Sequence, residues 1–117
     1  PWTVPLILDN NGFVDAYRTL YPNVFDYPGF TFPSDNEKVP TQKLAWAPKS
    51  DERDRIDYIF YYPHPQLELK NAAIFGPQGS IVKNQRKKET SKDPFIEPLD
   101  TWPTDHKGVF VTFLLKR

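Results

Sequence analysis

Two short stretches of the chain place acidic residues and a histidine where hydrolysis would need them. Asp57 lies inside the apolar run of residues 55–60, while Asp105 and His106 lie just before another apolar run, residues 109–115. A carboxylate that accepts a hydrogen bond from one imidazole nitrogen fixes the ring tautomer and raises the basicity of the other nitrogen. We therefore expect Asp57 and His106 to meet, with His106 acting as a general base in hydrolysis.

Simpler structural explanations exist for the same two residues. An ionised carboxylate inside a buried strand is costly unless it is paired, and Arg55 lies two positions away on the same strand face. A single histidine also often has a purely structural role, and His64, the other histidine, falls between two prolines on an expected exposed turn. A salt bridge between Asp57 and Arg55 and a pairing of Asp57 with His106 both remain open.

Asp105 has two possible roles, as a metal ligand or as a second contact to the imidazole. Carboxylate oxygens with few nitrogen ligands suit Mg²⁺, Mn²⁺ or Ca²⁺ better than Zn²⁺. The chain has no cysteine and only two histidines, so it contains no cluster of zinc type.

The composition sets limits on the class of protein. With 117 residues the chain forms one domain at most, and its fifteen basic and fifteen acidic residues cancel. Balanced charge gives no overall attraction to nucleic acid or membrane, so a preference for polyanions would have to come from residues 83–92, a run with five basic residues and one acid. That run is equally consistent with a solvated loop. No apolar run is long enough to span a membrane.

The elements that would position these residues are a few strands between long loops. Aromatic and β-branched runs bounded by turn residues predict strands over residues 55–62, 67–75 and 109–115, the first of them buried on both faces. Apolar spacing predicts short helices around residues 4–8 and 13–20, the first stopped at Gly12. Thirteen prolines and the polar composition predict that residues 22–53 and 80–103 are mainly loops, with one extended piece at residues 29–32.

Taken in order, several of these segments resemble the C-terminal half of the endonuclease/exonuclease/phosphatase superfamily. The segments are Gly-Phe-Val-Asp-Ala-Tyr-Arg at 12–18, Gly-Phe-Thr-Phe at 29–32, Arg-Ile-Asp-Tyr-Ile-Phe at 55–60 and Pro-Thr-Asp-His at 103–106. The resemblance implies an α/β fold, half of a DNase-I-like β-sandwich with a mixed sheet, short flanking helices and long loops. Residues 1–117 would be the C-terminal part of a single domain, and its N-terminal half would be their partner.

The resemblance also implies an activity, the metal-dependent hydrolysis of a phosphate ester. His106 would activate the attacking water, Asp57 would orient His106, and Asp105 would support the imidazole or the metal. Mg²⁺ or Mn²⁺ would be the cofactor, with Ca²⁺ an alternative, and the substrate would be a nucleic acid or a small phosphoester. The resemblance also places Phe32 and Trp46 in loops beside the substrate cleft, although ordinary aromatic packing explains them as well.

The chain departs from the family in ways that bear on this activity. Thr104 stands where the family usually has serine, which keeps a hydroxyl group. The family's early Asn and Glu and its Gly-Asp-x-Asn motif have no convincing counterpart, so the complete site would need the N-terminal half. The alternative is a catalytically inactive fragment or binding module that keeps the fold. The chain starts at Pro1 and contains no methionine, so we expect it to be part of a longer protein. Its composition leaves the compartment open.

Overall fold

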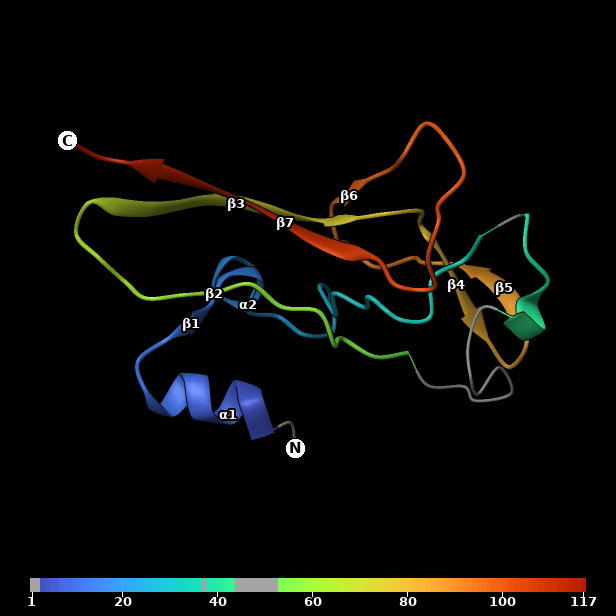
Figure 1. The fold of residues 1–117 in the computed structure, drawn as a ribbon, viewed down its shortest axis with the longest axis horizontal. Helices are drawn as coiled ribbons and strands as arrows, with labels where there is room; N and C mark the ends of the chain where they lie inside the picture. The colour runs from blue at the N-terminus through green and yellow to red at the C-terminus, as the bar shows by residue number, and fades with distance from the viewer. Residues whose placement is uncertain (1–2, 37, 44–52) are drawn as a thin grey trace.

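The computed structural model describes residues 3–36, 38–43 and 53–117, and it is mostly sheet with a few short helices (Figure 1). In chain order the elements are α1 (Thr3–Asn10), β1 (Val14–Asp15), α2 (Ala16–Leu20), the 3-10 helix η1 (Thr41–Lys43), β2 (Phe60–Tyr61), β3 (Leu67–Phe75), β4 (Gly79–Val82), β5 (Gln85–Lys88), β6 (Phe95–Ile96) and β7 (Gly108–Leu115). Among the described residues, no helix is both long and apolar enough to cross a membrane.

The largest sheet has the strand order β6-β3-β7 and is mixed, because β6 runs parallel to β3 while β7 runs antiparallel to it. The ladder between β3 and β7 extends from the Leu67–Leu115 pair to the Phe75–Gly108 pair, with a bulge after Leu69. The long strands predicted at residues 67–75 and 109–115 are therefore confirmed. In Figure 1 both helices lie on one side of this long strand pair. A mixed sheet with short helices was expected, and this coarse architecture is present.

The core lies between this sheet and α2. Tyr17 of α2 packs against Ala72 and Ile74 of β3, and all three are buried. The Tyr17 hydroxyl donates a hydrogen bond to the buried carboxylate of Asp93, which also accepts the backbone N–H of Gly29 at 3.0 Å. These contacts fix the start of the loop that carries residues 29–36 against the sheet.

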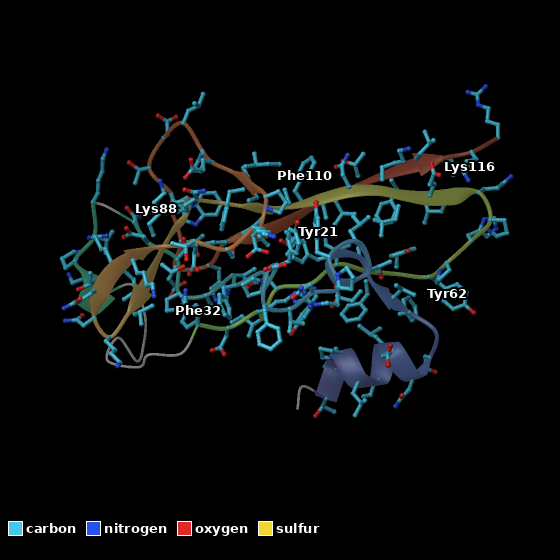
Figure 2. The ribbon with its side chains drawn as sticks, turned by 180° about the vertical axis from the view of Figure 1, so that it is seen from behind. Tyr21, Phe32, Tyr62, Lys88, Phe110 and Lys116 are labelled. Carbon is cyan, nitrogen blue, oxygen red and sulfur yellow. The ribbon has the colours of Figure 1, made fainter. Side chains whose placement is uncertain are left out.

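The opposite face of the sheet is largely open to solvent. Phe75, Phe110 and Leu114 keep 40%, 50% and 48% of their surface exposed. Figure 2 shows Phe110 on the other side of the strands from Tyr21, which belongs to the packed side. The apolar run of β7 therefore packs into the core with one face only.

The strand predicted over residues 55–62 is mostly absent. Only Phe60 and Tyr61 form a strand, β2, which pairs with β1 through Val14 and Asp15. Residues 55–59 are extended without a ladder, and none of residues 55–62 is buried. A side-chain oxygen takes the place of a strand partner here, because the hydroxyl of Thr31 accepts the backbone N–H groups at 56 and 57.

Two further predictions are corrected by the structure. Residues 80–103 were expected to be loop, yet β4 and β5 form a hairpin whose turn residues Lys83 and Asn84 have φ of 51° and 62°. Two consecutive positive φ values match the right-handed twist of the flanking strands, and asparagine tolerates them well. The helix expected over residues 13–20 is only α2, because residues 14–15 pair as β1 instead.

Candidate functional site

Asp57 and His106 meet as the sequence predicted. The distance between His106 Nδ1 and Asp57 Oδ2 is 2.8 Å, and the two side chains are 40% and 37% exposed. An ionised carboxylate can only accept hydrogen bonds, so the neutral imidazole carries its proton on Nδ1 and keeps its lone pair on Nε2. The ring is therefore oriented, and it is open to water. The catalytic roles of the two residues stay predictions.

The alternative salt bridge between Asp57 and Arg55 is wrong. Arg55 binds the Asp15 carboxylate with two guanidinium nitrogens, one of them Nη1 at 2.6 Å from Oδ2. Its guanidinium also lies 4.7 Å from the ring centroid of Tyr58. Asp15 has a second task, because it is the N-cap of α2 and accepts the N–H of Arg18. Arg55 therefore stabilises the junction of β1 and α2, and the Asp57 carboxylate pairs with His106 instead.

The turn that carries His106 is held by hydrogen bonds on both sides of the residue. The N–H of His106 donates to Thr104 Oγ1 at 3.2 Å, and its carbonyl oxygen accepts the indole N–H of Trp102 at 2.6 Å. The carbonyl of Asp105 accepts the N–H of the buried Ser34 at 2.6 Å. These contacts restrict the backbone of the turn, so the imidazole direction is set before any ligand binds.

Phe32 lies directly against the imidazole, with its ring centroid 5.0 Å from that of His106 and the planes tilted by 47°. Its backbone forms an isolated bridge to Asp54, at the start of the segment that carries Asp57. Phe32 therefore borders the site, while contact with a substrate stays a prediction. Trp46, the other residue expected at the cleft, lies outside the described residues.

Thr31 is hydrogen-bonded to both segments that carry the pair, at Asp57 and at Lys107 next to His106, and sequence reasoning gave it no role in the site. Its hydroxyl oxygen accepts the N–H groups of Ile56 and Asp57, each at 3.2 Å. Its carbonyl oxygen accepts the N–H of Lys107 at 2.7 Å, and its own N–H donates to the Asp54 carbonyl at 2.9 Å. The residue is fully buried. A threonine between two phenylalanines carries no spacing signal that would predict these contacts.

Lys107 is a second residue that the sequence did not flag. It is 2% exposed, and its Nζ donates to the Gly79 carbonyl at 2.6 Å and to Ser80 Oγ at 3.1 Å. Burial lowers the pKa of Lys107 to about 8, although the negative charge of Glu89 opposes this shift. The side chain therefore fastens the His106 turn to β4 at an electrostatic cost.

The described residues do not by themselves fit a metal ion. Within them, no group of three or more histidine, aspartate or glutamate side chains lies close enough together to hold one. Asp105 is partly exposed next to His106, but the expected metal role finds no support in its surroundings. A polar pocket of about 670 Å³ adjoins the site across Trp102, and it contains Lys38 and Lys88; neither Asp57 nor His106 lines it.

Comparison with known proteins identifies no class of protein for this chain. No family model and no solved structure matches the chain. An uncharacterized protein of Caenorhabditis elegans, F14F9.5, is 29% identical over 112 residues, which cover 96% of this chain and 31% of that protein. The chain therefore spans about a third of the length of this relative.

Proposed function

We propose that this chain supplies the general-base part of the active site of a phosphate-ester hydrolase with a DNase-I-like fold. The proposal is carried by one observation, the 2.8 Å contact between His106 Nδ1 and Asp57 Oδ2. Asp57 accepts a hydrogen bond from Nδ1–H, and the free Nε2 lone pair takes a proton from the attacking water. The carboxylate then stabilises the imidazolium that forms. A positioned base of this kind contributes on the order of 10² to 10⁴ in rate.

The surroundings of the pair support this chemistry. Water can reach the imidazole because 40% of the side chain is exposed. The Phe32 ring covers part of the imidazole and limits its rotation. The backbone of the turn is held from both sides by Trp102 and Thr104. A base has to be both reachable and fixed in direction, and this site combines the two properties.

The groups that neutralise the charge of the phosphate would come from another segment of polypeptide. The described residues contain no three-ligand group for Mg²⁺ or Mn²⁺. We place the missing ligands in the N-terminal half of the same domain, whose second sheet would cover the exposed face at Phe75, Phe110 and Leu114. The length of the C. elegans relative, about three times the matched segment, is compatible with such a partner.

The test compares the two histidines in the chain combined with its upstream segment. With bis(p-nitrophenyl) phosphate and Mg²⁺ or Mn²⁺, we expect His106→Ala to reduce kcat by on the order of 10² or more, because no other base replaces the imidazole. His64→Ala is the matched control, since His64 lies on an exposed turn and accepts the N–H of Gln66. Retention of more than a tenth of the activity in His106→Ala would contradict the proposal.

A second candidate function is a binding module that keeps the fold without the chemistry. It is favoured by the missing metal ligands and by the basic hairpin strand β5, all four residues of which are exposed. Lys88 of this strand and Phe32 lie toward the same end of the molecule in Figure 2. If the wild-type chain hydrolyses no phosphate ester, alone or with its upstream segment, the binding module is the better description.

A further inference from the structure

We propose that Thr31 is a positioning residue that fixes Asp57 and His106 relative to each other. The two partners come from segments far apart in sequence, one unpaired and extended, the other a turn. Among the described residues, no backbone hydrogen bond joins residues 55–59 directly to residues 105–107. Thr31 is the residue that both segments contact through hydrogen bonds.

Three atoms of Thr31 form this connection. Oγ1 accepts the N–H of Asp57 itself, so it fixes the backbone from which the carboxylate projects. The carbonyl oxygen accepts the N–H of Lys107, the residue that directly follows His106. The N–H donates to the carbonyl of Asp54, which keeps the 29–32 and 54–57 segments in register. One buried residue therefore fixes a backbone position at or next to each member of the pair.

The side-chain type suits this task. A hydroxyl oxygen has two lone pairs, so it can accept both N–H groups at once. The branched Cβ restricts rotation about χ1, which keeps the oxygen pointed at residues 56 and 57. Thr31 is fully buried, so water would not replace its hydroxyl oxygen as an acceptor if a substitution removed it. A displacement of about 1 Å would be enough to lengthen the Asp57–His106 contact beyond hydrogen-bond range.

This inference concerns the geometry of the pair, and only its catalytic consequence rests on the proposed function. The test is therefore spectroscopic. Imidazole ¹⁵N spectra of the chain in mildly alkaline buffer report which nitrogen of His106 carries the proton. We expect the Nδ1–H tautomer in the wild type and in Thr31→Ser, which keeps the hydroxyl. In Thr31→Val we expect at least a twofold loss of that tautomer in favour of Nε2–H.

The matched control is Thr19→Val. The Thr19 hydroxyl also bonds to the backbone, but as a donor to the Asp15 carbonyl; Thr19 lies on α2 and is not hydrogen-bonded to Asp57 or His106. We expect its His106 spectrum to equal that of the wild type. Should Thr31→Val not fold in dilute buffer, the spectra are recorded in sucrose, which favours compact states. The proposal would be overturned if folded Thr31→Val kept the Nδ1–H tautomer unchanged, or if Thr31→Ser lost it. If Thr31→Val stays unfolded, the proposal is judged by whether Thr31→Ser keeps the Nδ1–H tautomer.

Phosphodiester hydrolysis by the chain with its upstream segment separates the two proposals. If both hold, Thr31→Val lowers kcat about tenfold with little change in KM, and Thr31→Ser restores kcat. If the tautomer responds as expected while the wild type hydrolyses nothing, the positioning role stands and the proposed function fails. If the wild type hydrolyses the phosphodiester and the tautomer does not respond to Thr31→Val, the proposed function stands and the positioning role fails.

Discussion

The contact between Asp57 and His106 lies at the surface. It can therefore matter for the chemistry of the imidazole while contributing little to the stability of the fold. Exposed ion pairs contribute at most about 1 kcal/mol to stability, because water screens them. Both side chains are more than a third exposed. The tautomer that the pair selects is nevertheless fixed by geometry and does not depend on a strong net attraction. The pair therefore has little effect on the fold and a large effect on which imidazole nitrogen is free.

Asp57→Asn should reveal this separation. An amide no longer holds the Nδ1 proton as a carboxylate does, so we expect kcat on a phosphodiester to fall by on the order of 10². The free energy of unfolding should change by less than about 1 kcal/mol. Urea denaturation and steady-state kinetics, with the neighbouring Asp54→Asn as the control, test both parts. A large loss of stability in Asp57→Asn would show that the pair is structural.

Lys107 gives the protein an unusual dependence of stability on pH. Its folded pKa of about 8 lies below the ordinary value of 10.5, so the unfolded chain binds more protons between these values. Stability should therefore rise by about 1 kcal/mol from pH 7 to pH 9 as the buried ammonium loses its proton. Above about pH 10 it should fall, because burial raises the pKa of Tyr17 and of Tyr58 and the unfolded chain ionises first.

The measurement is the urea midpoint of the wild type and of Lys107→Met at several pH values. The slope between pH 7 and pH 9 should vanish in Lys107→Met, which removes the titrating group and keeps the length of the side chain. The charges that face Lys107 are Glu89, Arg53, Asp93 and Glu97, and they are the same in both proteins. An equal slope in the two proteins would assign the effect to another group.

At the scale of elements, the sequence predicted the segments that depend on apolar pattern and failed where side chains replace backbone partners. The ladder of β3 and β7 follows from two apolar runs of similar length. Residues 55–59 have the same pattern, but the N–H groups of Ile56 and Asp57 donate to the Thr31 hydroxyl, which no periodicity reveals. The strand β5 consists entirely of exposed polar residues, so no apolar pattern predicts it; Arg86 holds it to the Asp35 carboxylate and to the Val39 carbonyl.

Gly29 shows how a single turn residue determines the position of a larger element. Its φ is +68°, and a Cβ at this position would lie 2.9 Å from Cε2 of Tyr17. Gly29→Ala should therefore destabilise the protein by about 2 kcal/mol or more through backbone strain and overpacking. Gly108→Ala is the control, because its added Cβ would meet nothing closer than 3.8 Å and its φ is ordinary. We expect the control to change stability by less than about 0.5 kcal/mol in urea denaturation.

At the scale of the whole molecule, the sheet has one packed face and one open face. The site residues were partly predictable, because Asp57 and His106 stand out by residue type beside apolar runs. Thr31 and Lys107 were not, since their role depends on contacts between segments distant in sequence. The apolar residues on β7 indicate burial by a second layer, and the described residues leave this face open because they supply no such layer. Whether the apolar residues of this face are buried depends on whether another segment of polypeptide covers the sheet. A pattern of hydrophobicity does not show whether that segment is present.

The open face should make the 117-residue chain associate with itself when no other polypeptide covers it. Exposed apolar patches favour association, and Phe110 lies near the middle of this one, half exposed. We expect Phe110→Lys to shift the chain toward the monomer in analytical ultracentrifugation without lowering its urea midpoint.

Thr112→Lys is the matched control, since Thr112 lies on the same face of β7 and the variant adds the same charge without removing apolar surface. If both variants dissociate equally, charge repulsion is the cause. If Phe110→Lys associates as strongly as the wild type, this face does not mediate the contact. If an N-terminal half covers this face as proposed, adding it should make this chain stop associating with itself, and Phe110→Lys should bind it more weakly than the wild type does.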